Sequence, residues 1–155
     1  MLAAVATRVA ATPFAEWATS SPLAYPVANT VHVLALVLLL GGIGLVDLRL
    51  LGRFRSLPLE PLMRALVPVA SAGVLIMAAS GSVLFAADAE ALARSGTFRL
   101  KLGLVAAALA NVALFRWLAG AGPADPPPPA ARLLALTSLL LWTAVAVAGR
   151  MIAYS

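Results

Sequence analysis

Long apolar runs separated by short polar connections dominate the pattern of this chain. A membrane-spanning helix needs roughly 20 mostly apolar residues. Four runs satisfy that requirement, and they cover about 24–46, 65–86, 100–119 and 132–152. The pattern therefore predicts four transmembrane helices.

The N-terminal stretch is less apolar, because Arg8, Pro13 and Glu16 interrupt it. Over about 3–19 we expect a short interfacial helix, with Phe14 and Trp17 at the level of the lipid headgroups. The whole chain, 1–155, is then one membrane domain. The predicted fold class is all-α, an integral membrane four-helix bundle with a short N-terminal interfacial helix.

Composition agrees with a bilayer environment. Of 155 residues, 63% are hydrophobic and 11% are charged, whereas about a quarter of the residues in soluble domains are charged. The chain has no cysteine, which excludes disulfides, thiolate metal sites and a cysteine nucleophile. The net charge of +5 comes from basic residues at helix ends, where they contact lipid headgroups, so we expect no nucleic-acid partner.

The basic residues also predict an orientation. The first and third connections between the helices carry or adjoin an excess of arginines, namely Arg49, Arg53, Arg55, Arg64, Arg116 and Arg132. Connections rich in lysine and arginine stay in the cytoplasm. We therefore expect a multi-pass protein of the bacterial inner membrane with both termini in the periplasm.

His32, the only histidine, lies within the first apolar run, about 12 Å below its outer end at 1.5 Å per residue. Ionisable groups at membrane depth usually face the bundle interior or a cavity. Helical spacing and the predicted orientation place polar or ligating groups from all four helices near its level. The predicted site comprises His32, Tyr25, Asn29, Met77, Ser80, Lys101 and Arg150.

This residue set fits haem b or a quinone. A neutral imidazole is a common axial ligand, so His32 would hold the haem iron, and Lys101 and Arg150 would pair with the propionates. A quinone headgroup would instead form a hydrogen bond with the imidazole. One histidine cannot supply two axial ligands, so a haem requires Met77, an open position or a homodimer that supplies a second His32.

Structural interpretations of the same residues stay open. His32 can tie helices together through Asn111 or Ser80, and Met77 can be a packing residue. Lys101 and Arg150 can extend to the membrane surface. Small-residue faces at Gly41–Gly44 and Gly103–Ala107 predict close helix contacts, as in a scaffold or assembly subunit of a larger membrane complex.

The inner ends of the helices hold a second group of charges. We expect Asp47 to form an ion pair with Arg49 or Arg116 that fixes these ends. Because the acidic residues are all predicted at helix ends or in connections, the sequence does not favour a proton or ion translocator.

Several strings resemble a known family: "WATSSPLAYPVANTVHVLAL", "DLRLLG", "TFRLKLGL" and "GRMIAY". Together they are similar to a family of uncharacterised four-helix bacterial inner-membrane proteins, a domain of unknown function, over about 17–154. A weaker likeness links the chain to CopD-like and HemJ-type membrane proteins. HemJ-type protoporphyrinogen oxidases pair an early histidine with a later lysine and bind haem b, and His32 and Lys101 match those positions in type and order.

Three functions follow from these observations. The first is haem b or quinone binding in membrane electron transfer. The second is a non-catalytic scaffold subunit. The third, implied by the HemJ-type resemblance, is oxidation of a porphyrin. The further polar motifs of the HemJ type are absent, and the chain has fewer outer histidines and methionines than CopD-like copper proteins.

Overall fold

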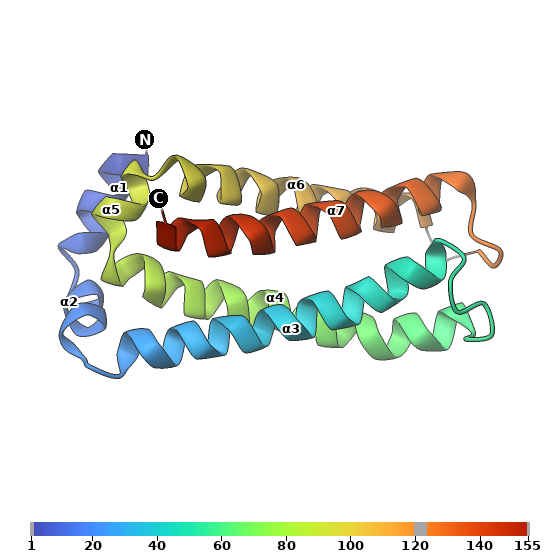
Figure 1. Ribbon diagram of the computed structural model, residues 1–155, viewed down its shortest axis with the longest axis horizontal. Coiled ribbons are helices and arrows are strands. Elements are labelled where there is room, and N and C mark those ends of the chain that lie inside the picture. The colour runs from blue at the N-terminus through green and yellow to red at the C-terminus, as the bar shows by residue number, and fades with distance from the viewer. Residues whose placement is uncertain (1, 120–123, 155) are drawn as a thin grey trace.

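The computed structural model describes residues 2–119 and 124–154, and every regular element in those ranges is a helix. Four long helices form the body of the molecule (Figure 1): α3 (Ala24–Leu50), α4 (Leu59–Ala87), α6 (Gly96–Ala119) and α7 (Pro129–Met151). Short helices occupy one end: α1 (Leu2–Ala10), α2 (Pro13–Ser20), α5 (Ala89–Arg94) and the 3-10 turn η1 (Ile152–Tyr154).

The four long helices are each long and apolar enough to cross a membrane. The predicted all-α, four-span architecture is therefore confirmed. The helices extend beyond the predicted apolar runs: α3 continues to Leu50, and α4 already begins at Leu59. Helix ends can project into the headgroup region, where long polar side chains reach water, so the apolar run marks only the central part of each helix.

The N-terminal segment differs from the single predicted helix, because it is broken at Thr12. The Thr12 hydroxyl accepts a hydrogen bond from the Ala15 amide at 3.3 Å, and Pro13 occupies the first turn of α2, where a missing N–H costs nothing. Alanines then pack this segment onto the bundle, with Ala6 against α5 and Ala15 against the end of α4.

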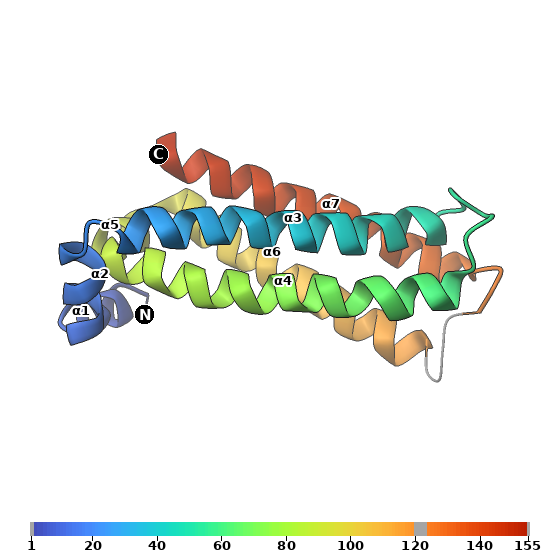
Figure 2. The same ribbon diagram turned by 90° about the horizontal axis from the view of Figure 1, so that it is seen from below.

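The long helices form two hairpins, α3–α4 and α6–α7, which contact each other mainly through α3 and α7. Figures 1 and 2 show both chain ends at one end of the bundle, together with α1, α2 and α5. We call this the terminal end. The opposite end, with the α3–α4 and α6–α7 connections, is the loop end.

The α3–α4 contact is the closest in the fold because glycines allow it. A methyl group on Gly73 would lie 2.8 Å from the Ala35 carbonyl oxygen, and one on Gly42 would lie 3.1 Å from the Leu66 carbonyl oxygen. Gly42 thus confirms the close contact predicted for Gly41–Gly44, although Gly41 itself has open space beside it. Gly103 makes no such contact within the described residues, because nothing there within 4 Å would meet a methyl group.

Arg49 connects the two hairpins at the loop end. Its Nε donates to the Leu57 carbonyl at 2.6 Å, and its Nη2 forms an ion pair with Asp125 at 2.9 Å. The predicted pairing of Asp47 with Arg49 or Arg116 is therefore wrong. Residues two apart on a helix point in nearly opposite directions, so Arg49 reaches the connections while Asp47 turns into the bundle.

Candidate functional site

The His32 imidazole lies at the α3–α4 contact on the terminal side of the central core. Its Nδ1 is 2.9 Å from the Ser80 hydroxyl oxygen on α4. The ring covers Gly81, where a methyl group would lie 3.2 Å from Cε1. Ser80 is buried and His32 is half-buried. The structure thus joins two of the predicted site residues directly.

The hydrogen bonds around Ser80 determine the tautomer of His32. A hydroxyl has one proton, and the Ser80 hydroxyl lies 2.7 Å from the carbonyl oxygen of Ile76, to which it donates. The bond to His32 must then run from Nδ1–H to the Ser80 oxygen. We assign the proton to Nδ1 from this network.

This tautomer leaves the other ring nitrogen of His32, Nε2, without a proton. In a neutral imidazole that carries its proton on Nδ1, Nε2 has a free lone pair. The two nitrogens point in nearly opposite directions, so Nε2 points away from Ser80. Nε2 can therefore coordinate a metal ion or accept a hydrogen bond. The bond from Nδ1–H to Ser80 fixes the orientation of the imidazole, as is usual for a metal-ligating histidine.

Lys101, at the start of α6, is the part of the second hairpin that interacts electrostatically with His32. Its side chain is partly buried and lies over Gly149 of α7, where a methyl group would be 3.4 Å from Nζ. A glycine thus makes room for each of the two nitrogen bases, Gly81 for His32 and Gly149 for Lys101. The sequence analysis did not identify either glycine, although the small-residue run "AASGS" around Gly81 is a usable signal.

Three other predicted site residues lie apart from this pair. The side chains of Tyr25 and Asn29 are exposed on the outer surface of α3. Arg150 is exposed and is engaged by Tyr154: its Nη2 donates to the Tyr154 hydroxyl at 2.6 Å, and its guanidinium lies 4.9 Å from the ring centroid.

Met77 lies one turn from Ser80 on α4 and packs against the central core around Leu39, Ala108 and Trp142. Asn111, the other predicted partner for His32, donates instead to the Leu134 carbonyl at 3.1 Å and links α6 to α7.

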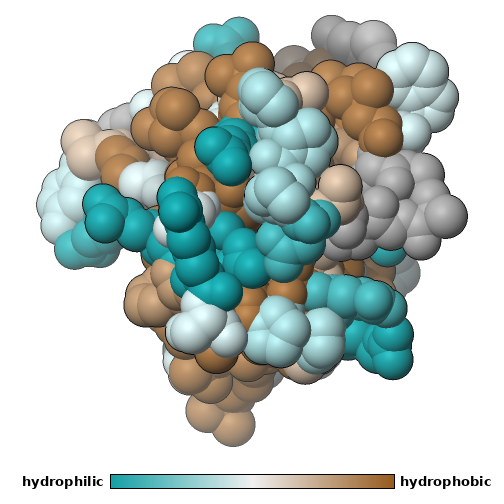
Figure 3. Space-filling view, turned by 90° about the vertical axis from the view of Figure 1, so that its right-hand side faces the viewer, coloured by the Kyte–Doolittle hydropathy of each residue, from teal (hydrophilic) through white to brown (hydrophobic). Residues whose placement is uncertain are grey.

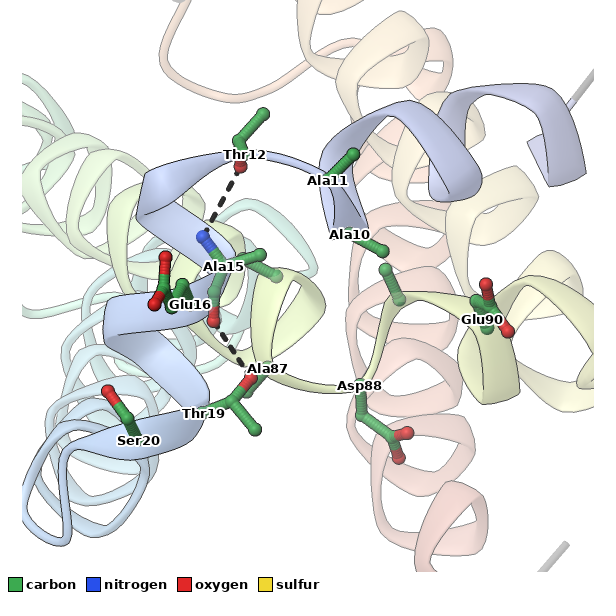
Figure 4. A pocket seen from close by; sticks show the side chains of 12 residues that line it. Ala10, Ala11, Thr12, Ala15, Glu16, Thr19, Ser20, Ala87, Asp88 and Glu90 are labelled. Atoms are coloured by element: carbon green, nitrogen blue, oxygen red, sulfur yellow. Dashed lines mark hydrogen bonds between the residues drawn. The ribbon is translucent and has the colours of Figure 1, made fainter.

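An open groove at the terminal end separates α2 from the junction of α4 and α5 (Figure 4). It has a volume of about 600 Å³, and its lining is half alanine and half polar, with Thr12, Glu16, Thr19, Ser20, Asp88 and Glu90 as the polar residues. Glu90 is paired with Arg94 at 3.2 Å. In the described residues, no group of three or more histidines and carboxylates is arranged to hold a metal ion.

Comparison with known proteins gives one result. The model of a family of unknown function (DUF6644) matches residues 14–155, which include all four spans, His32 and Lys101. No curated protein and no solved structure matches the chain. The resemblance predicted from the sequence motifs is thus confirmed, and the chain belongs to the family of unknown function DUF6644 as a four-span membrane protein.

Proposed function

We propose that this protein binds haem b in the terminal half of the bundle and serves in membrane electron transfer, with His32 Nε2 as an axial ligand. The observation that carries the proposal is the hydrogen bond from Nδ1–H to Ser80. It orients the ring, fixes the tautomer and leaves the lone pair of Nε2 free. Axial histidines require these three conditions.

Lys101 supports the same proposal. It belongs to the opposite hairpin, yet it is close enough to His32 to interact electrostatically. A haem propionate would pair with this ammonium group, while the apolar surfaces of the surrounding helices would contact the porphyrin. When bound, the haem would supply one-electron chemistry. The chain would bind it, orient it and exclude water from it.

Each chain supplies a single histidine. The Met77 side chain packs against the central core, which does not favour it as a second ligand to the iron. The proposal therefore allows a haem with an open position or a haem held by His32 from two copies. Haem-to-protein ratios of one to one and one to two distinguish these arrangements.

The test is the absorbance spectrum of full-length protein purified in detergent from haem-replete cells, before and after dithionite. We expect a Soret band that shifts on reduction in the wild type and disappears in His32→Ala. Asn29→Ala, an exposed change one turn away on α3, is the matched control and should keep the band. Colourless wild-type protein that also fails to bind added hemin would contradict the haem proposal.

A quinone is the second candidate, and the same two residues favour it. Nε2 can accept a hydrogen bond from a quinol hydroxyl, and the Lys101 ammonium can donate one to a quinone carbonyl. This alternative predicts that a short-chain ubiquinone analogue binds to the colourless protein and that Lys101→Met weakens the binding at least about tenfold, the value of one lost charge-assisted hydrogen bond.

If neither ligand binds, the scaffold interpretation gains. The His32–Ser80 bond then serves only to hold α3 against α4. The porphyrin oxidase implied by the HemJ-type resemblance is tested separately, by rescue of a strain that lacks protoporphyrinogen oxidase. Rescue that depends on Lys101 would establish that activity.

We also propose the bacterial inner membrane as the location, with the terminal end in the periplasm. The loop end carries the arginine-rich connections, which favour the cytoplasm. A reporter that is active only in the periplasm, fused after residue 155, should be active. Inactivity of this fusion together with activity of a fusion in the α3–α4 connection would reverse the orientation.

A further inference from the structure

A cavity of about 380 Å³ lies between the four long helices near the loop end. All four helices contribute to its wall, which is mostly apolar. The polar residues that line it are Asp47, Arg64, Asn111, Arg116 and Ser138. Its volume is within the range of small-molecule sites.

Two buried side chains in this wall each carry an oxygen atom without a hydrogen-bond partner in the described part of the chain. Asp47 is only 3% exposed and Ser138 only 4%. By distance and angle, Asp47 Oδ2 and Ser138 Oγ form no hydrogen bond within the described residues, although Ser138 lies close enough to Asp47 for its hydroxyl to stabilise the carboxylate. Buried polar atoms normally have a hydrogen-bond partner, so Asp47 and Ser138 together indicate that a hydrogen-bond donor from a ligand belongs here.

The nearby arginines do not supply that donor. Arg49 is engaged by Leu57 and Asp125, and Arg64 is engaged by Glu60 at 2.6 Å. Arg116 lies at the exposed rim of the cavity and forms no ion pair within residues 2–119 and 124–154. A carboxylate buried without a cation or donor is costly. The chain therefore presents an unpaired acid inside the cavity and an unpaired base at its rim.

The α4 helix adds another acceptor. Pro68 lies inside α4 and lines the cavity together with Arg64. Proline has no N–H group, so it cannot donate to the carbonyl four residues earlier, which is that of Arg64. The Arg64 carbonyl is therefore a further acceptor in this part of α4 that lacks its usual helical donor.

The position of the cavity indicates the source of the ligand. Asp47 is three residues from the end of α3, or about 5 Å at 1.5 Å per residue, so it lies near the level of lipid headgroups. Of the helices around the cavity, α4 and α6 are not packed closely against each other. Figure 3 shows hydrophilic side chains gathered at the loop end between apolar flanks, as expected for the edge of a bilayer.

We propose that this cavity binds the headgroup of a zwitterionic phospholipid that has N–H donors, with its ammonium at Asp47 and Ser138 and its phosphate at Arg116. The ammonium of phosphatidylethanolamine offers three N–H donors, which suit the buried oxygen atoms Asp47 Oδ2 and Ser138 Oγ. Arginine at the rim suits the phosphate. The acyl chains leave between α4 and α6 toward the bilayer. This site is distinct from the one around His32.

The test compares lipid binding to the full-length protein by native mass spectrometry in detergent, with phosphatidylethanolamine, phosphatidylcholine and phosphatidylglycerol as probes. Phosphatidylcholine has the same charges but no N–H donor. We expect phosphatidylethanolamine to bind at least about tenfold more tightly than phosphatidylcholine, the value of a buried charge-assisted contact. Asp47→Asn should abolish that preference, and Arg116→Gln should weaken the binding of all three lipids.

Asp88→Asn is the matched control, because it makes the same change in an exposed carboxylate at the terminal end. It should leave lipid binding unchanged. Should Asp47→Asn fail to fold, Ser138→Ala tests the same contact and should reduce the preference. Equal binding of phosphatidylethanolamine and phosphatidylcholine to the wild type, or a preference that survives Asp47→Asn, would overturn the proposal. Strong phosphatidylglycerol binding that is insensitive to Asp47 would also overturn it, because the arginines alone would then explain the affinity.

Discussion

Helix α3 carries two ionisable residues that face a serine on a neighbouring helix, and the two pairs differ in every other respect. His32 is 2.9 Å from Ser80 across the tight α3–α4 contact. Asp47 is beside Ser138 of α7, but neither Asp47 Oδ2 nor Ser138 Oγ has a hydrogen-bond partner among the described residues. The first pair lies over a glycine and the second lines a cavity.

The difference shows what packing does to a polar group in a membrane bundle. At the close contact between α3 and α4, one hydrogen bond satisfies Nδ1 of His32 and leaves Nε2 available in a defined direction. Where the helices stand apart, the chain itself does not satisfy the polar atoms, and a ligand must do so. We therefore assign a cofactor to the terminal end and a lipid to the loop end.

The largest expected effect comes from breaking the contact that holds the first pair. Gly73→Ala would place a methyl group 2.8 Å from the backbone oxygen of Ala35, and the helices would have to separate. We expect a loss of about 2–3 kcal/mol in the free energy of unfolding in mixed micelles. Gly41→Ala, with open space around it, should leave stability unchanged or slightly raised. Equal effects of the two changes would contradict the account of the contact.

A change of Arg49 at the loop end tests whether its partner is Asp125, as the structure shows, or Asp47, as the sequence predicted. Arg49→Gln should cost about 2 kcal/mol, since a buried guanidinium loses an ion pair with Asp125 and a bond to Leu57. A double-mutant cycle should show coupling of about 1 kcal/mol with Asp125→Asn and almost none with Asp47→Asn. Coupling to Asp47 instead would restore the pairing predicted from the sequence. Arg94→Gln, in an exposed pair with Glu90, should change stability by less than about 0.5 kcal/mol.

The smallest expected effect distinguishes the two serines directly. Ser80→Ala removes the acceptor for His32 Nδ1–H and should cost about 1 kcal/mol, because a partly buried donor is left unpaired. Ser138→Ala removes a hydroxyl that forms no hydrogen bond within residues 2–119 and 124–154, so it should cost less than about 0.5 kcal/mol in lipid-free micelles. Unfolding titrations of both variants measure this difference, and a larger cost for Ser138→Ala would contradict it.

The length of the apolar runs predicted the four spans, because about 20 apolar residues per helix is a constraint that the bilayer imposes. It also placed His32 and Ser80 at one level. It could not show that Tyr25 and Asn29 lie on the outer surface of α3, because helical spacing defines a face but not the neighbour that covers it. The broken N-terminal segment was readable in principle, since Thr12–Pro13 is a helix-start signal.

The loop end was harder to predict. Asp47 was expected to pair with an arginine because opposite charges were predicted together at the inner ends of the helices. Which arginine an acid meets depends on the helix rotation and on the path of the connections, and Arg49 was drawn to Asp125, which is distant in sequence. The tight packing at Gly73 was missed for a similar reason: a glycine on one helix gives no sign of which backbone lies opposite.

The central claim is that His32 holds its proton on Nδ1 and presents a free Nε2. Because the chain has one histidine, nitrogen-15 NMR of protein labelled at histidine, purified without cofactor in detergent, reports on this ring alone. The account predicts a protonated Nδ1 and an unprotonated Nε2 whose resonance shifts when hemin or a quinol is added. A proton on Nε2, with Nδ1 accepting from Ser80, would contradict it.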